Sequence, residues 1–428
     1  MPSRHIHVGE GRVVVRLRQG QAETAEAGEP MTGGAAGLRR RPEDPQRATF
    51  LELFFDLVFV LALFRVSQGL LEHLTWTGAF QTLVLLLALW WVWVHTAGAA
   101  DILDPRRAPI QLLVIATMFG TLLLAAAAPE AFHERGLFFA GAYVAIQVGR
   151  SVFIVAVVRD DEVRPFYLRL LFWFGVSAVP WIAGAAAHDT ARAVLWTLAL
   201  AVEYTAIALR YPTPWFGRAR AAEFAISGEH LGERYRQFFI IALGELILAT
   251  GLAFGNGGFE AERSAAVVVA FATIVLLWRI YIYRAGELYD MALAAAPDPL
   301  RVGIPAAYSH LAMIAGIVAI AVGDELVIVH PFGHTQPAWI AVILGGPALF
   351  LAGRALFEYA VFRRVSWDRP IGVLVLAVIS PVMILVPPLG VATAAVVVLV
   401  GVAVADAMRA RRHPRELPSR PGSAAIEP

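Results

Sequence analysis

Apolar runs that approach twenty residues recur along the chain, for example at positions 79–94, 110–128 and 265–278. A helix of about twenty apolar residues spans the roughly 30 Å hydrocarbon core of a bilayer. The period-2 alternation that outer membrane barrels require is not sustained anywhere in the sequence. With 58% hydrophobic and only 16% charged residues, the chain also has too few charges to solvate the surface of a soluble domain. The sequence therefore predicts an all-α polytopic membrane protein.

Composition and missing motifs exclude several classes of function. The net charge is +1, so nothing favours nucleic acid as a partner. The absence of cysteine excludes disulfides, thiolate metal sites and cysteine nucleophiles. No GxxxxGK[ST] phosphate loop is present, so we expect no ATP-driven pumping by this chain. No cofactor is identified; the expected partners are the lipid bilayer and an unidentified small solute or ion, and an oligomer is compatible with the apolar helix faces.

Hydropathy predicts about twelve spans between two polar tails. The last two are separated only by Pro387, Pro388 and Gly390. The segment 370–408 therefore forms either two crossings or one broken segment, and its length favours two. The predicted helices cover residues 51–71, 76–100, 109–128, 134–158, 166–187, 190–211, 235–255, 264–285, 303–323, 337–362, 370–387 and 389–408.

Arginine sets the orientation of these spans. All 35 basic residues are arginine; with twelve spans, 27 lie in the tails or in loops on the same side of the membrane. Three lie in loops on the other side, at Arg135, Arg192 and Arg263, and five lie within spans. Cytoplasmic loops carry the positive excess, so we expect both termini in the cytoplasm and the protein in the bacterial plasma membrane.

The chain divides into two tails, two helical halves and a central loop. The leader lacks the apolar stretch of a signal peptide, and translation starts at either Met1 or Met31. We expect a disordered cytoplasmic tail at 1–48, a six-helix half at 49–211, a cytoplasmic loop at 212–234, a second six-helix half at 235–408 and a disordered cytoplasmic tail at 409–428.

The two halves resemble each other faintly. Residues 89–98 align without gaps to residues 277–286, which places Asp56 opposite Glu245. Two six-helix halves with the same orientation would form a parallel repeat, related by an axis along the membrane normal. Chance similarity between apolar helices is the alternative.

Ionisable side chains within spans are the main functional candidates, because each is unfavourable in a bilayer unless it is paired or hydrated. Asp56, Glu245 and His310 lie well inside predicted helices. Buried carboxyl groups change protonation, and histidine changes charge near neutral pH. We therefore interpret these three residues as candidates for a proton or ion pathway.

Other charged residues fall into two further groups. Glu52, Glu233, Arg234 and His230 lie near the cytoplasmic ends of helices and would form a vestibule or gate. A second group of charges would instead fix which helices are neighbours, with the i,i+4 pair neutralising itself. These predicted structural charges are Arg65, Arg150, Glu203, Arg354 and Glu358.

A metal site is a weaker possibility. His230 and Glu233 have helical spacing, but the second histidine of an HExxH zinc motif is missing, and His310 would have to serve as a distant third ligand. We therefore assign no metal and no catalytic residue.

Residues 49–60 read TFLELFFDLVFV, residues 233–248 read ERYRQFFIIALGELIL, and Tyr308-Ser-His310 is followed by Gly316 and by Gly323-Asp-Glu325. These three segments resemble the signatures of the bacterial low temperature requirement protein A family. The resemblance covers roughly residues 45–410 and implies a many-helix bacterial inner-membrane protein linked by name to growth in the cold. It implies little about chemistry. It places Glu52, Asp56, Glu233, Arg234, Glu245 and His310 at signature positions.

Three functions follow as hypotheses. The first is a proton-coupled secondary transporter or ion-conducting protein. The second is a non-transporting membrane protein, such as a lipid- or pigment-handling or assembly factor, that supports membrane function in the cold. The third is an intramembrane lipid enzyme with a metal at His230, Glu233 and His310, and we expect the protein not to be an enzyme.

Overall fold

In the computed structural model of the chain, all regular secondary structure is helical within the described residues. These are residues 38–40, 48–161, 163–220, 228–256, 258–282 and 300–412. The all-α prediction is confirmed for this part of the chain.

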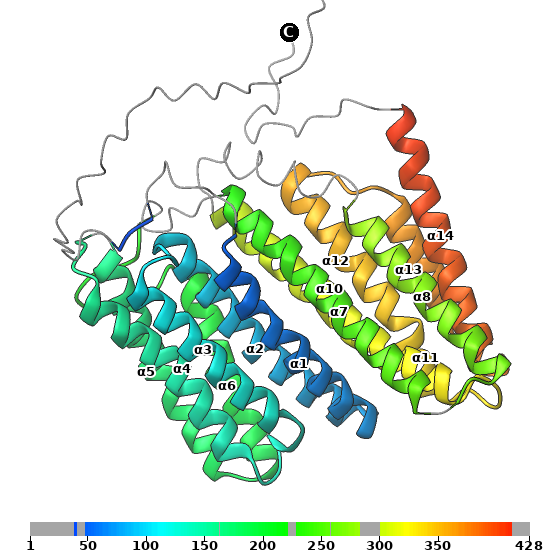
Figure 1. Ribbon diagram of the computed structural model, residues 1–428, viewed down its shortest axis with the longest axis horizontal. Coiled ribbons are helices and arrows are strands. Elements are labelled where there is room, and N and C mark those ends of the chain that lie inside the picture. The colour runs from blue at the N-terminus through cyan, green and yellow to red at the C-terminus, as the bar shows by residue number, and fades with distance from the viewer. Residues whose placement is uncertain are drawn as a thin grey trace, which may run out of the picture. The chain divides into compact units, whose positions relative to one another are not determined.

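The first half of the chain folds into six long helices and one short 3-10 turn (Figure 1). Their ends follow ordinary capping chemistry: Thr49 and Glu52 form a capping box that begins the first helix. The elements are α1 (Phe50–Glu72), α2 (Trp76–Ile102), α3 (Ala108–Ala127), η2 (Ala128–Glu130), α4 (Gly136–Val157), α5 (Val163–Ala186) and α6 (Asp189–Ala208).

The second half contains long and short helices. Its elements are α7 (Gly228–Gly255), α8 (Ala261–Ile282), α10 (Leu300–Val329), α11 (Pro337–Ile343), α12 (Gly345–Phe362), α13 (Asp368–Ile379), η4 (Val382–Leu385) and α14 (Pro388–Arg412). The predicted helix 337–362 is thus divided at Leu344, and the predicted helix 370–387 is replaced by α13 and η4.

Ten helical segments of the described residues are long and apolar enough to cross a membrane. One of them combines α11 and α12, and α1 is not among the ten. That helix carries Glu52, Asp56 and Arg65, while α13 has only 12 residues. A multi-helix membrane architecture is therefore confirmed, whereas the count of twelve spans stays a prediction.

Two helix boundaries differ from the sequence prediction in ways that affect the site. Helix α7 begins at Gly228, so the end of the predicted loop 212–234 is helical and carries His230. Helix α10 continues to Val329, which places Asp324 inside the helix rather than at its outer end. In both places charged residues interrupt the apolar pattern, although the backbone remains helical around them.

Part of the predicted disordered leader is ordered against the first half. The amide of Arg40 donates to the carbonyl of Ile102 at 3.0 Å, and the amide of Asp104 donates to the carbonyl of Leu38 at 2.9 Å. Helix α14 likewise extends to Arg412, beyond the predicted boundary at residue 408. The rest of both predicted tails lies outside the described residues.

Helix α1 occupies a central position, since it packs against α2, α3, α7 and α10. In the second half, α10 and α12 approach closely because glycines face each other. A Cβ on Gly316 would lie 2.7 Å from the backbone nitrogen of Phe350, and one on Gly353 would lie 2.8 Å from that of Met313. Small residues allow such close contact between membrane helices. The junction of α1, α7 and α10 contains most of the predicted functional residues.

Candidate functional site

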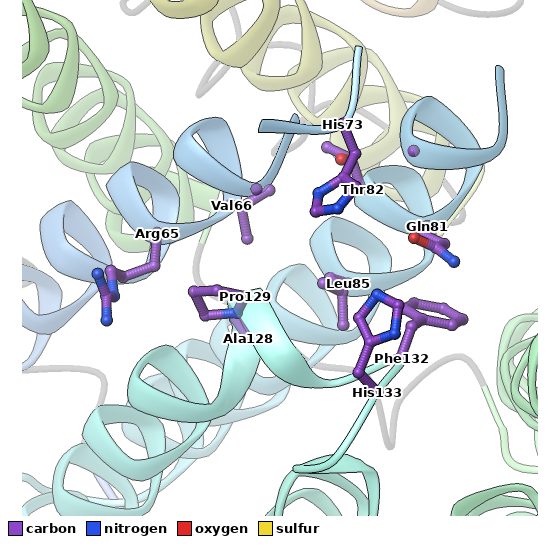
Figure 2. A pocket seen from close by; sticks show the side chains of 12 residues that line it. Arg65, Val66, His73, Gln81, Thr82, Leu85, Ala128, Pro129, Phe132 and His133 are labelled. Atoms are coloured by element: carbon purple, nitrogen blue, oxygen red, sulfur yellow. The ribbon is translucent and has the colours of Figure 1, made fainter. Parts of the chain in front are cut away.

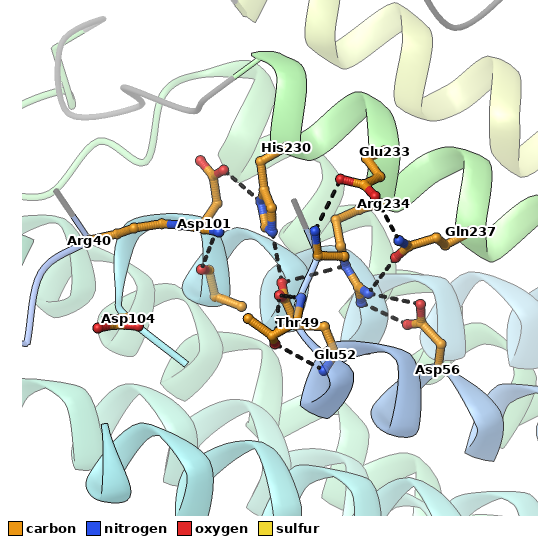
Figure 3. Close-up of polar contacts among 12 residues, drawn as sticks. Arg40, Thr49, Glu52, Asp56, Asp101, Asp104, His230, Glu233, Arg234 and Gln237 are labelled. Atoms are coloured by element: carbon orange, nitrogen blue, oxygen red, sulfur yellow. Dashed lines mark hydrogen bonds and ion pairs between the residues drawn. The ribbon is translucent and has the colours of Figure 1, made fainter. Parts of the chain in front are cut away.

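A buried cluster of charged residues joins α1, α2 and α7 (Figure 3). It combines the first turns of α1 and α7 with the C-terminal end of α2. We call it the α1–α2–α7 network. Its five principal residues, all at most 5% exposed, are Glu52, Asp56, Asp101, His230 and Arg234.

Asp56 and Arg234 form the closest ion pair of this network. The Nη1 and Nη2 atoms of Arg234 donate to the two carboxylate oxygens of Asp56 at 2.9 and 2.7 Å. The indole of Trp93 donates a third hydrogen bond to Asp56, at 2.9 Å. The Arg234 guanidinium also lies 5.8 Å from the centre of the Trp93 ring. This two-point pairing compensates a charge pair that is fully buried.

His230 lies between two carboxylates. Its Nδ1 is 2.8 Å from an oxygen of Asp101, and its Nε2 is 2.9 Å from an oxygen of Glu52. An imidazole offers an N–H to both neighbours only when both ring nitrogens are protonated. The histidine and its two carboxylates therefore form a buried group whose stability depends on the number of protons that it holds.

Glu233 and Gln237 extend the network to the segment that precedes α1. Glu233 accepts from the amide of Ala48 at 3.0 Å and from Gln237 at 3.3 Å. Gln237 in turn accepts from Arg234 at 3.1 Å. All four residues predicted for the vestibule or gate therefore belong to one set of contacts, together with Asp56.

Sequence reasoning missed two members of this network. Asp101 lies at the end of α2 outside every recognised motif, and Trp93 lies in a tryptophan-rich stretch that resembles ordinary apolar packing. A signal for Asp101 was available: it is a carboxylate near the same predicted membrane face as His230 and Glu52.

Glu245 lies in a separate environment, between α1, α7 and α10. It is 0% exposed, and one carboxylate oxygen accepts from Ser67 at 2.8 Å. The other oxygen has no hydrogen-bond partner among the described residues. Its electrostatic neighbours are the acidic residues Asp324 and Glu325.

Glu245, Asp324 and Glu325 together form what we call the outer carboxyl cluster. Glu325 is half-buried and accepts from Gln68 at 2.7 Å, so adjacent residues of α1 contact Glu245 and Glu325. Asp324 is buried, and one of its oxygens is also without a partner among the described residues. No arginine or histidine in that part of the chain forms an ion pair with any of the three carboxyls.

His310 lies against aromatic residues. Its Nδ1 is 2.8 Å from the carbonyl of Ala306, so Nδ1 carries a proton and donates to that oxygen. Its Nε2 lies 3.1 Å from the hydroxyl of Tyr281. Its ring stacks on Tyr235 with a centroid distance of 4.5 Å, and Tyr235 lies 5.5 Å from Trp93. His310 is thus linked to the α1–α2–α7 network through aromatic rings.

The three predicted pathway residues do not share a direct contact among the described residues. Asp56 lies in the α1–α2–α7 network, Glu245 lies in the outer carboxyl cluster, and His310 lies against Tyr235 and Tyr281. His230 and His310 likewise have different partners. No group of three or more described histidines or acidic residues is arranged to hold a metal ion.

Two predicted structural charges of the first half, Glu203 and Arg150, are joined by a continuous hydrogen-bonded chain. Glu203 accepts from Tyr143 at 2.5 Å, Ser177 at 2.6 Å and Trp181 at 3.2 Å. Gln147 donates to the Tyr143 hydroxyl and accepts from Arg150. Buried opposite charges are therefore connected through neutral polar groups, and each oxygen of Glu203 has a donor.

The remaining structural candidates differ from one another. Arg354 and Glu358 are only loosely paired, at 3.7 Å, because Glu358 lies closer to Arg369, at 3.1 Å. Arg369 also pairs with Asp406 of α14, at 3.0 Å. Arg65 is half-buried and has no acceptor among the described residues. The charges at 354 and 358 thus belong to a larger network between α12, α13 and α14.

Known proteins match most of this chain. The family model described as bacterial low temperature requirement A protein matches residues 47–404. An uncharacterized protein of Rhizobium meliloti (strain 1021) is 37% identical over 341 residues, which cover 78% of this chain and 83% of that protein. No solved structure matches significantly.

Proposed function

Since the chain belongs to the bacterial low temperature requirement A family and is an integral multi-pass membrane protein, we propose that it is a proton-coupled secondary transporter or ion-conducting protein. The observation that carries the proposal is the outer carboxyl cluster. Among the described residues, Glu245 is fully buried, accepts one hydrogen bond, and has the acidic residues Asp324 and Glu325 as its charged neighbours.

A carboxylate in such surroundings is strongly destabilised. Burial removes its hydration, and the usual compensation is an ion pair, several hydrogen bonds or a bound proton. In the part of the chain that the structure describes, Glu245 has no ion pair and accepts a single hydrogen bond, so proton uptake is the compensation that we propose for it. Glu325 is half-buried and joined to Gln68, which gives the cluster a connection toward the ends of α1 and α10.

The α1–α2–α7 network would then act as a closed gate on the cytoplasmic side. Its contacts hold the first turn of α7 against α1 and α2, so a passage between these helices requires that the Asp56–Arg234 and His230 contacts separate. Asp56 would exchange a proton only when Arg234 moves away. His310, linked to this network through Tyr235, would complete the proposed pathway.

The proposed topology has twelve spans, both termini in the cytoplasm and a location in the bacterial inner membrane. Twenty-seven of 35 basic residues then face the cytoplasm or lie in the cytoplasmic tails. The proposal counts α1 as a span, together with α13 and η4. It also retains two parallel six-helix halves, in which α1 and α7 correspond and pack against each other.

Proton flux into liposomes tests the proposal. The purified protein is reconstituted with an internal pH dye, and a potassium diffusion potential is imposed with valinomycin. We expect wild-type flux above that of protein-free liposomes, and loss of that excess in Glu245→Gln and Asp56→Asn. The matched control is Glu262→Gln, which changes an exposed carboxylate at the start of α8 and should leave flux unchanged.

The alternative is a non-transporting protein that supports membrane function in the cold. The fully paired Asp56 and Arg234 favour it, because such a pair also serves simply to hold helices together. It predicts no flux from folded wild-type protein, and it predicts that network variants change only thermal stability. Wild-type flux that survives unchanged in both Glu245→Gln and Asp56→Asn would contradict the proton pathway.

A further inference from the structure

A shallow, open pocket lies where the C-terminal end of α1 meets the N-terminal end of α2 and η2 (Figure 2). It is far along α1 from Asp56 and shares no residue with the α1–α2–α7 network or the outer carboxyl cluster. Its polar lining consists of Arg65, His73, Gln81, Thr82 and His133.

Arg65 is the unusual member of this pocket. It lies in an apolar helix, is half-buried, and has no acceptor among the described residues. Other arginines within the described helices donate to side-chain or backbone oxygens, as Arg150, Arg169, Arg192, Arg234 and Arg354 do. With α1 counted as a span, as in the proposed topology, Arg65 lies at membrane depth, where an arginine without an acceptor is unfavourable, so its guanidinium suits an anionic ligand.

The other polar residues that line the pocket also favour an anionic ligand. His73 and His133 approach each other with a ring-centroid distance of 6.1 Å, and Gln81 and Thr82 add an amide and a hydroxyl. Figure 2 shows the two histidines on one side of the pocket and Arg65 on the other, with Pro129 between them. No carboxylate lines the pocket, although the exposed Glu72 and Glu130 lie next to it in sequence. The pocket therefore offers several hydrogen-bond donors and no competing negative charge.

The position of Arg65 along α1 matches the depth of the phosphate groups of a lipid bilayer. It precedes the end of α1 by seven residues, which corresponds to about 10 Å along the helix axis. A long arginine side chain at this depth reaches the interface, where lipid phosphates lie. The histidines, by contrast, are exposed beyond the end of the helix.

We propose that this pocket binds a phosphate group, with Arg65 as the principal contact, and that a phospholipid supplies it. The guanidinium would donate paired hydrogen bonds to the phosphate oxygens, while His73, His133 and Gln81 bind the polar end of the headgroup. This site is independent of proton flux, since none of its residues belongs to the proposed pathway.

Binding to purified protein in detergent tests the site. The probes are phosphatidylglycerol, a diacylglycerol with the same acyl chains but no phosphate, and inorganic phosphate. Retained lipid is counted by native mass spectrometry, and stabilisation is followed as a change in Tm. Arg65→Met is compared with Arg135→Met, which removes an exposed arginine outside the pocket that donates to the carbonyl of Ala126.

We expect wild-type protein and Arg135→Met to retain phosphatidylglycerol, and Arg65→Met to bind it at least about tenfold more weakly. Stabilisation by inorganic phosphate alone, lost in Arg65→Met, would support the phosphate site but assign it to a soluble anion. Equal retention of diacylglycerol, or unchanged lipid binding in Arg65→Met, would overturn the proposal. If Arg65→Met does not fold, the exposed pair His73→Ala/His133→Ala should still weaken binding, and unchanged binding there counts against the site.

Discussion

Two glutamates within the helical bundle have the same burial and opposite surroundings. Glu203 on α6 is 1% exposed, and Glu245 on α7 is 0% exposed. Glu203 accepts three hydrogen bonds and is connected through Tyr143 and Gln147 to the cation Arg150. Glu245 accepts one hydrogen bond, and its electrostatic neighbours are two further acids.

The difference shows that burial alone does not identify a functional carboxyl group in a membrane protein. Glu203 has the partners that stabilise a buried charge and a positive group to balance it, so its environment suits a permanent structural role. Glu245 lacks them, so its environment suits a group that takes up and releases a proton. Asp56 resembles Glu203 in this respect, because the positive charge of Arg234 balances its negative charge.

Removal of the Arg234 charge that balances Asp56 should have the largest effect on stability. Arg234→Met leaves Asp56 buried without its cation, which should destabilise the fold by about 3–5 kcal/mol. The free energy of unfolding is obtained from denaturant titration in detergent, with Asp56→Asn/Arg234→Met as the second variant. The double variant should recover much of the loss, and a double variant as unstable as Arg234→Met would show that Asp56 is not the uncompensated charge.

A substitution at Glu203 should have the second-largest effect on stability. Glu203→Leu leaves Tyr143, Ser177 and Trp181 without their acceptor, and we expect a loss of about 3 kcal/mol. The measurement is the same denaturant titration, with Glu262→Leu at an exposed site as the control. A change below about 1 kcal/mol would mean that the first-half hydrogen-bonded chain does not stabilise the fold and that the contrast with Glu245 is weaker than the geometry indicates.

This contrast was only partly accessible from the sequence. Hydropathy and arginine distribution gave the helical membrane class because both depend on composition along single helices. The gate residues were predicted together because three of them lie within five positions of the chain, at 230–234. Asp101 and Asp324 were not assigned roles, because the partner of Asp101 lies on another helix and Asp324 lies in an unpredicted extension of α10. Whether a buried acid has a counter-charge depends on contacts between helices, which periodicity does not encode.

The hydrogen bond from Ser67 to Glu245 provides a smaller and more discriminating test. If Glu245 holds a proton, Ser67→Ala removes a hydrogen bond between neutral groups and should lower the free energy of unfolding by about 1 kcal/mol. If Glu245 carries a charge, the same substitution removes a charge-assisted bond and should lower it by about 1.5–3 kcal/mol. In a double-mutant cycle with Glu245→Gln, the glutamine oxygen still accepts from Ser67, so the coupling measures how much stronger the bond to the native carboxyl group is than a bond to a neutral acceptor. A coupling near zero is expected for a protonated Glu245, and a coupling of about 1 kcal/mol or more would contradict it.

Glu245→Gln should have the smallest effect on stability of the four changes. A glutamine has the shape of a protonated glutamate, so if the native carboxyl is protonated the substitution should change the free energy of unfolding by less than about 1 kcal/mol. In Glu203→Gln, by contrast, an NH2 group replaces one of the two acceptor oxygens. It then faces either Tyr143 or the pair Ser177 and Trp181, which already donate there, and we expect a clear loss of stability. Denaturant titrations of the two glutamine variants, measured in parallel, check this difference. Equal destabilisation would show that both carboxyls are structural. A stable Glu245→Gln protein that has lost proton flux would instead separate the structural role of Glu245 from its role in transport. The fold would then depend on the shape of this side chain, and the transport step would depend on its proton.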